Sequence, residues 1–156
     1  MRLKKIILFI LILVWMCIIF NFSAQDSNES LNTSNEVIIK TAEVIKKEKL
    51  TEPEKKSLIK KFIVPVRKSA HFFLYFVLGI LVFLFVSEYI RTQKKTILLT
   101  VIACFIYACT DEIHQLFSDG RTARILDVII DTSGAFISSI ICYFTYYIYK
   151  RIKKTN

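Results

Sequence analysis

Residues 96–115 read TILLTVIACFIYACTDEIHQ and decide the fold. The uninterrupted apolar part ends at Thr110, which is too short to cross a bilayer, because a hydrocarbon core of about 30 Å needs about 20 residues of helix. A helix of that length continues to Gln115 and carries Asp111 and Glu112 inside the membrane boundary. Ionisable groups at that depth, about one turn from the outer edge, cost on the order of a few kcal/mol and by default indicate a functional site. We therefore interpret these carboxylates as functional rather than as an interfacial end of the helix.

Three further apolar runs have the length of membrane helices, so we predict an all-α integral membrane protein, a bundle of four transmembrane helices. We expect the spans at residues 6–22, 70–90, 96–116 and 125–149, within a single domain over 1–156. The composition agrees, because 54% of the residues are hydrophobic and only three are glycine, too few for a Gly-rich phosphate loop. All four cysteines lie in apolar runs, where thiols act as small hydrophobic groups, so neither disulfides nor a zinc site is expected.

The first run also has features of a secretory signal peptide, namely a basic start, an apolar middle and a possible cleavage position at Ser23-Ala24. We favour a retained helix for two reasons. The run is long, and position −3 of that cut is Phe22 rather than a small residue.

The net charge of +9, from 22 Lys and Arg against 13 Asp and Glu, is spread over the flanks of the apolar runs. With both termini inside, the inner segments carry ten Lys and Arg and the outer segments twelve, so counting alone slightly favours the reverse orientation. The first helix usually sets the orientation, however, and residues 23–39 contain no Lys or Arg. We predict that both termini are cytoplasmic and that the loop at 23–69 is outside. No basic face is interleaved with aromatic residues, so no nucleic-acid partner is expected.

The outer loop is expected to contain amphipathic helices. Residues 23–35 are small and polar and are interpreted as a solvated linker. Two pairs match the capping box that opens a helix: Thr33 with Glu36, and Thr51 with Glu54. The second helix places apolar and lysine side chains on opposite sides, and Pro65 is expected to break it before the second span. Such a helix either lies flat on the membrane surface or forms a charged hairpin over the bundle, and both alternatives stay open.

Small and polar residues form a stripe along each of the last three spans, and such stripes face protein rather than lipid. On the fourth span the stripe is Asp127, Asp131, Gly134, Ser138, Cys142 and Thr145. On the third it is Gln115, Asp111, Ala108 or Tyr107, Cys104 and Thr100. On the second it is His71, Tyr75 and Gly79, with Arg67 and Lys68 just before.

The unusual polar residues all fall at one end of the bundle. Only residues 118–124 connect the third and fourth spans, with Asp119-Gly120 as the turn, so these helices are antiparallel neighbours. Their outer ends bring the carboxylates close to Arg121 and Arg124. The predicted topology adds four polar residues to the same side: Arg67, His71, Ser23 and Gln25.

Four motifs, taken in order, resemble the VanZ-like family of small bacterial membrane proteins. They are W-x4-F-x2-S-x-Q at 15–25, RKSAHF at 67–72 with Tyr75, DEIHQLF at 111–117 running to Gly120-Arg121, and DVIIDTSGA at 127–135. The resemblance leaves 26–62 uncovered, and Asp119 stands where a proline is expected. It implies a bacterial cell-membrane location and a role in the cell envelope, because the family's namesake is associated with low-level teicoplanin resistance without a change of the cell-wall precursor terminus. It supplies no settled catalytic mechanism.

Three hypotheses fit these residues. In the first, a non-enzymatic protein binds an anionic lipid headgroup or a lipid-linked precursor, with Arg and Lys meeting its phosphates. The residues of that site are Arg67, Lys68, His71, Asp111, Glu112, Gln115, Arg121, Asp127 and Asp131. In the second, an intramembrane enzyme uses the carboxylates with His71 or His114 as acid–base pairs. In the third, the charges are a structural network that locks the helices together. We favour the first, then the third.

Neither a cofactor nor a metal is expected from the sequence. Carboxylates can hold a divalent metal through oxygen ligands, but no ligand spacing in this chain is diagnostic. No Ser or Cys stands beside a base in the sequence, which disfavours a nucleophilic enzyme. His114 is interpreted as an interfacial histidine, and the tyrosines of residues 143–149 are interpreted as an aromatic belt at the inner boundary.

Overall fold

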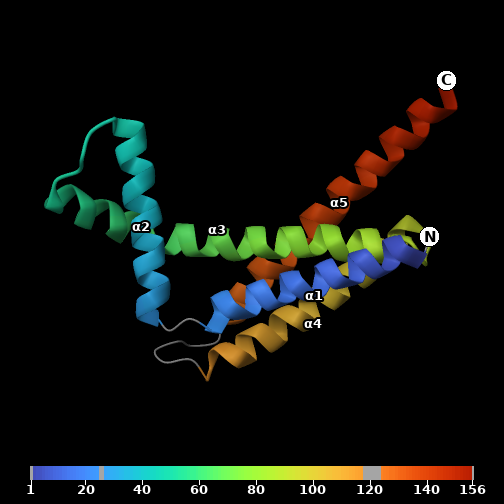
Figure 1. The fold of residues 1–156 in the computed structure, drawn as a ribbon, viewed down its shortest axis with the longest axis horizontal. Helices are drawn as coiled ribbons and strands as arrows, with labels where there is room; N and C mark the ends of the chain where they lie inside the picture. Colours follow the sequence, from blue (N-terminus) through green and yellow to red (C-terminus); the bar gives the residue numbers. More distant parts are fainter. Residues whose placement is uncertain (1, 25–26, 118–123, 156) are drawn as a thin grey trace.

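The computed structural model describes residues 2–24, 27–117 and 124–155, and within these residues helices joined by short loops are the regular secondary structure. The helices are α1 (Arg2–Ala24), α2 (Ser27–Lys46), α3 (Glu52–Ser87), α4 (Gln93–Gln115) and α5 (Ile125–Thr155) (Figure 1). Four of them, α1, α3, α4 and α5, are long and apolar enough to cross a membrane. The predicted all-α membrane bundle with four spans is confirmed.

The surface of the bundle is apolar and part of its interior is polar, which is the reverse of a water-soluble protein. Large side chains such as Phe9, Leu98 and Ile106 are about half exposed, at 50%, 58% and 57%. Thr100 and Ser138, in contrast, are completely buried. Lipid tails are as apolar as leucine, so membrane helices associate through close packing and polar contacts rather than through the hydrophobic effect. The predicted inward-facing stripes are confirmed in α3 and α4.

Two glycines let α3 and α5 pack backbone against backbone, in the most extensive helix contact of the bundle. A Cβ atom added at Gly134 would lie 2.4 Å from the carbonyl oxygen of Phe72. A Cβ atom added at Gly79 would lie 2.3 Å from the Ser138 hydroxyl and 2.7 Å from the Cα atom of Ala135. Larger residues at these two positions would push the helices apart, so the glycines set the distance between α3 and α5.

Hydrogen bonds from Trp15 and Tyr107 to backbone carbonyls help to attach α1 to the other spans. The Trp15 indole N–H donates a 2.8 Å hydrogen bond to the carbonyl oxygen of Leu74 in α3. The Tyr107 hydroxyl of α4 donates a 2.7 Å hydrogen bond to the carbonyl oxygen of Met16. Buried Trp and Tyr normally find such a partner, but the sequence did not identify which backbone groups they would reach.

The segment between α1 and α3 differs from its prediction. Residues 27–35, expected to be part of a solvated linker, form the first turns of α2, and Thr33 lies within that helix rather than at its cap. Ser, Asn and Thr cost less than about 0.7 kcal/mol per residue in a helix, so packing easily overrides their preference for loops. α2 packs against α3, as in the hairpin alternative, and both Ile38 and Leu50 are buried.

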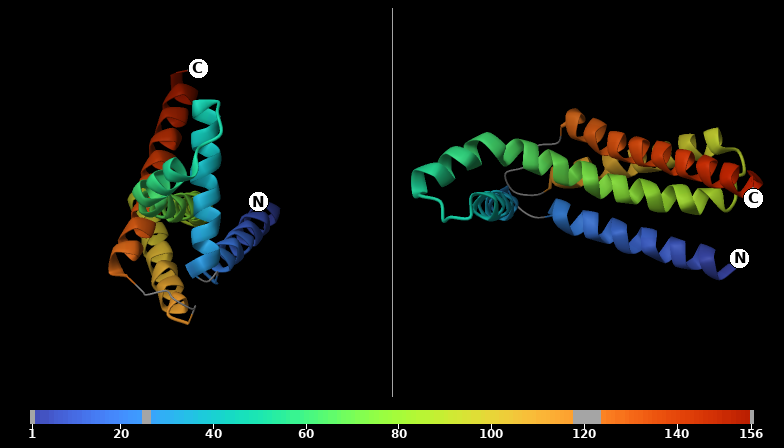
Figure 2. Two further views of the ribbon diagram at one scale, coloured as in Figure 1. Left: turned by 90° about the vertical axis from the view of Figure 1, so that its left-hand side faces the viewer. Right: turned by 90° about the horizontal axis from the view of Figure 1, so that it is seen from above.

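α3 continues without interruption through Pro65, so the predicted break is wrong. A proline removes one backbone hydrogen bond and kinks a helix without always ending it, and the first half of α3 is bent in Figure 2. The predicted capping box at the start of this helix is confirmed. The Glu54 carboxylate accepts hydrogen bonds from the backbone N–H of Thr51 at 2.9 Å and from the Thr51 hydroxyl at 2.7 Å.

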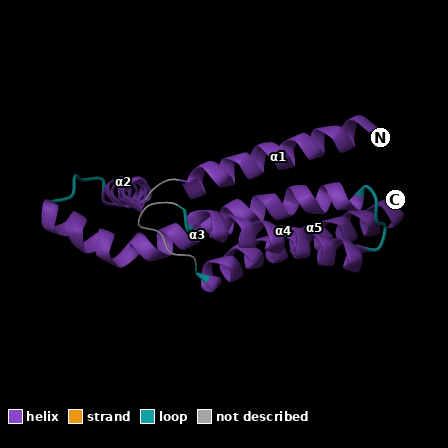
Figure 3. Cartoon of the chain, turned by 90° about the horizontal axis from the view of Figure 1, so that it is seen from below, coloured by secondary structure: helices purple, strands orange, loops and turns teal. Residues whose placement is uncertain are grey.

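The start of α1, the turn between α3 and α4 and the end of α5 lie at the same end of the molecule (Figures 1 and 3). Near this end α5 diverges from the other helices. None of the described residues 141–153 is buried, and Thr145, expected to continue the inward stripe, is exposed. The prediction for α5 therefore holds as far as Ser138 and is wrong at Thr145, because the helix leaves the bundle.

Candidate functional site

Side chains from four helices meet toward the end of the bundle that lies opposite the α3–α4 turn. The polar cluster consists of Ser23 from α1, His71 and Tyr75 from α3, Asp111, Glu112 and Gln115 from α4, and Asp131 from α5. Asp131 and Tyr75 are 0% exposed, and Asp111 is 3% exposed. Five of the predicted site residues thus come together in one buried cluster: His71, Asp111, Glu112, Gln115 and Asp131.

The centre of the polar cluster is a histidine between two aspartates. His71 Nδ1 lies 3.6 Å from Asp131 Oδ1. One nitrogen or oxygen atom from each of His71, Asp111 and Asp131 lies within 4.8 Å of the other two. The glycine contact explains this proximity, since Gly134 brings α5 against the backbone of Phe72, the residue next to His71.

The outer part of the polar cluster is only partly hydrogen-bonded. The Gln115 amide nitrogen lies 3.4 Å from Asp111 Oδ2, and Ser23 lies against the same carboxylate. Glu112 Oε2 accepts a 2.8 Å hydrogen bond from the backbone N–H of Arg124. Several buried oxygens of the polar cluster have no hydrogen-bond partner among the described residues, including Asp111 Oδ1, Glu112 Oε1, Asp131 Oδ2 and the Tyr75 hydroxyl. Buried polar atoms are normally satisfied, and exceptions point to strain, to function or to a bound water or ion.

Basic residues lie at the rim of this cluster. Lys68 Nζ lies 3.6 Å from Asp127 Oδ1, and both side chains are partly exposed, at 37% and 28%. Arg67 is half-buried on α3, one helical turn before His71. Two predicted neighbours, Arg121 and Gln25, and the turn at Asp119-Gly120 lie outside the described residues.

His114 does not join the cluster's centre. Its ring packs on Phe20, with 4.2 Å between ring centroids, and its side chain is half-buried. This aromatic contact between α1 and α4 fits the predicted interfacial histidine better than a role as an acid or a base.

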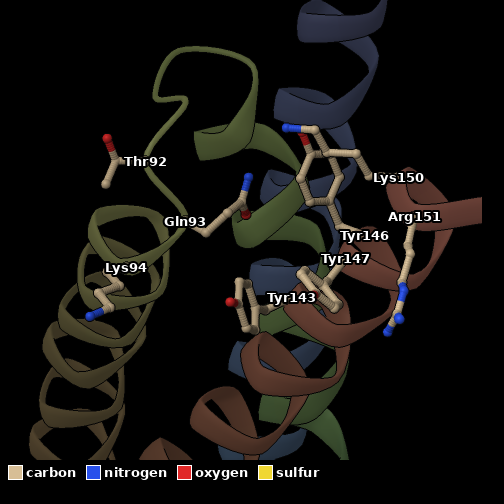
Figure 4. A pocket seen from close by; sticks show the side chains of 8 residues that line it. All are labelled: Thr92, Gln93, Lys94, Tyr143, Tyr146, Tyr147, Lys150 and Arg151. Carbon is tan, nitrogen blue, oxygen red and sulfur yellow. The ribbon is translucent and has the colours of Figure 1, made fainter. Parts of the chain in front are cut away.

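A separate groove of 840 Å³ lies at the opposite end of the bundle, between the start of α4 and the diverging part of α5 (Figure 4). Its lining residues are Thr92, Gln93, Lys94, Tyr143, Tyr146, Tyr147, Lys150 and Arg151. α4 begins at this groove and ends at the polar cluster, which separates the two sites by about 30 Å of helix. The sequence predicted the tyrosines only as a membrane belt, because the divergence of α5 is not encoded in any local motif.

A family model described as VanZ/LLP1 matches residues 8–147, nearly the whole chain. No curated protein and no solved structure matches the chain. The matched region contains most of each of the four helices that are long enough to span a membrane and every residue of the polar cluster.

Proposed function

The chain belongs to the VanZ/LLP1 family, and from that premise we propose that it is a cell-envelope protein that binds an anionic lipid headgroup or a lipid-linked precursor. The binding site is the polar end of the bundle. The observation that supports this proposal is the placement of Arg67 and Lys68 on α3, directly beside the buried polar cluster. Guanidinium and ammonium groups at such a rim bind phosphate oxygens through charge-assisted hydrogen bonds.

The orientation is part of the same proposal. Arg2, Lys4 and Lys5 precede the first span, and the charges before the first helix usually determine which side stays in the cytoplasm. Both termini are then cytoplasmic in a bacterial membrane, and the polar end, with α2, faces outward. There it meets the outer leaflet and the precursors of the cell wall.

Lipid titration of the purified full chain in detergent tests this function. We expect Arg67→Ala and Lys68→Ala each to weaken binding of short-chain phosphatidylglycerol about tenfold, since a hydrogen bond to a charged group contributes about 1.5 kcal/mol. Lys94→Ala, a matched loss of charge at the groove, is expected to leave the affinity unchanged. Equal affinity in all variants, or equal affinity for phosphatidylcholine, contradicts the proposal.

A second experiment tests the envelope role. We expect expression of the wild-type chain to raise teicoplanin tolerance of a sensitive host, and Lys68→Ala to reduce this protection at equal membrane level. A loss of protection that accompanies a loss of folded protein would favour the alternative in which the charges form a structural network. Turnover of a lipid-linked substrate that Asp111→Asn abolishes would favour the enzyme.

A further inference from the structure

We propose that His71, Asp111 and Asp131 bind one divalent transition-metal cation within the membrane. These residues come from three different helices, α3, α4 and α5. The inference goes beyond lipid binding and does not depend on it, because the three side chains lie inside the cluster rather than at the basic rim.

The separation of the three groups fits a single ion. Two ligands at about 2.1 Å from one tetrahedral ion lie about 3.4 Å apart. His71 Nδ1 and Asp131 Oδ1 are already 3.6 Å apart. All three ligand atoms lie within 4.8 Å of one another, so small side-chain rotations bring Asp111 into the same coordination sphere.

The burial of the carboxylates requires a compensating charge. Asp131 and Asp111 are 0% and 3% exposed, and Asp131 interacts with His71 but also with three other carboxylates, those of Asp111, Glu112 and Asp127. Removing a carboxylate from water costs several kcal/mol, and buried charges are therefore paired or coordinate metals. One imidazole faces two aspartates here, and a divalent cation balances the charge of both.

The oxygens without hydrogen-bond partners support the same site independently. Asp131 Oδ2 and Asp111 Oδ1 are buried and have no such partner among the described residues. The Tyr75 hydroxyl, one helical turn after His71, is also buried without one and interacts electrostatically with both aspartates. Gln115 holds Asp111 from the outer side, as hydrogen-bonded partners hold metal-binding carboxylates elsewhere. Three protein ligands leave a coordination position for water or for a bound phosphate oxygen.

The ligand types select the class of cation. An imidazole with two carboxylates suits Zn²⁺, Mn²⁺ or Fe²⁺, whereas Ca²⁺ prefers six to eight oxygen ligands. Mn²⁺ is the better probe because the four free cysteines bind Zn²⁺ more readily than Mn²⁺.

The test is a titration of the purified full chain in detergent, after treatment with a chelator and without a histidine tag or added anionic lipid. We expect one equivalent of Mn²⁺ to bind, seen as loss of the electron paramagnetic resonance signal of free Mn²⁺, and Zn²⁺ to compete with it. Asp111→Asn and Asp131→Asn keep the side-chain volume and are each expected to weaken Mn²⁺ binding at least tenfold. Glu88→Gln, a loss of one carboxylate in the turn between α3 and α4 at the opposite end of the bundle, is the control and is expected to change the affinity less than twofold.

A spectroscopic measurement on the wild-type chain tests whether a histidine ligates the bound metal, even if an Asn variant fails to fold. Bound Mn²⁺ is expected to show hyperfine coupling to an imidazole nitrogen, and His114→Phe, which removes the other of the two histidines, is expected to retain it. Absence of stoichiometric binding, absence of nitrogen coupling, or equal affinity in Asp111→Asn, Asp131→Asn and Glu88→Gln overturns the inference. Since no anionic lipid is added, these outcomes leave the lipid-binding proposal untouched, and failure of lipid binding leaves this inference standing.

Discussion

The two ends of the bundle contain the same helices but are built differently. At the polar end, α3 and α5 touch through Gly79 and Gly134, and buried polar groups fill the interior. At the groove end, α5 diverges, and Tyr143, Tyr146 and Tyr147 line an open space with basic residues. In a membrane, apolar side chains gain nothing by leaving lipid for protein. Helices therefore stay together only where small residues and polar contacts hold them, and on α5 the last buried residues are Ser138 and Ser139.

The largest expected effect comes from breaking the central pair of the polar end. His71→Gln leaves Asp131 buried without its imidazole partner, and we expect the metal-free protein to lose about 3–5 kcal/mol of stability. The double variant His71→Gln/Asp131→Asn is expected to recover most of this loss, because it removes the uncompensated charge as well. Unfolding in mixed detergent measures both, with Lys150→Gln at the groove as the control that changes little. Strictly additive effects of the two substitutions would show that the pair is not coupled.

A smaller effect is expected from separating the backbones of α3 and α5. Gly134→Ala places a methyl group against the Phe72 carbonyl, and overpacking of this kind costs about 1–3 kcal/mol. Thr145→Ala, three turns later on the same helix, is expected to stay within about 0.5 kcal/mol because the site is exposed. Thermal unfolding of the two variants compares the ends directly. A similar loss at both positions would mean that the groove end is packed as closely as the polar end.

Two Tyr→Phe substitutions, each of which removes one hydroxyl group, compare the packed part of the bundle with the groove end. Tyr107→Phe removes the hydrogen bond to Met16 that attaches α4 to α1, which we expect to cost about 1 kcal/mol. Tyr146→Phe at the groove alters an exposed side chain and is expected to cost less than about 0.5 kcal/mol. The free energy of unfolding, measured for each variant and for the wild type, compares the two costs. If Tyr146→Phe is the more damaging change, the groove has a structural role that its exposure does not suggest.

The smallest effect is expected outside the spans, where α2 meets α3. The Glu54 carboxylate raises the pKa of Lys46 above its ordinary value of 10.5 through a hydrogen bond and charge attraction. A raised folded-state pKa gives stability that is complete below 10.5 and is lost as the pH rises through the folded pKa. Lys46→Gln should therefore flatten the fall of the melting midpoint at alkaline pH slightly. Identical alkaline curves for the wild type and the variant would show that water screens the pair completely.

Much of the fold followed from hydropathy and spacing. The four spans and the cluster residues on α4 were predictable because a stripe of polar residues on a long apolar helix faces other helices rather than lipid. The continuation of α3 through Pro65 was not predictable, since a proline favours the end of a helix locally and only tertiary packing overrides that preference. α2 illustrates the same point, because its start is composed of residues that favour loops.

The sequence alone also did not predict that the polar cluster could bind a metal ion. His71, Asp111 and Asp131 are 40 and 20 residues apart in turn, so no short motif links them as it links the ligands of a zinc finger. The stripes predicted that each residue faces protein, but the 3.6 Å approach of His71 to Asp131 depends on the glycine contact between α3 and α5. The helix face on which a residue lies can be predicted from the local sequence, whereas the distance between side chains on different helices cannot.

The continuous α3 has a structural consequence. Its 36 residues measure about 54 Å along the axis, while the hydrocarbon core is about 30 Å thick, so nearly half of the helix extends beyond the membrane. α2 rests on this extension. Pro65 lies within this continuous helix, only six residues before His71. The helix against which α2 packs is thus the same continuous helix that places the half-buried His71 in the polar cluster.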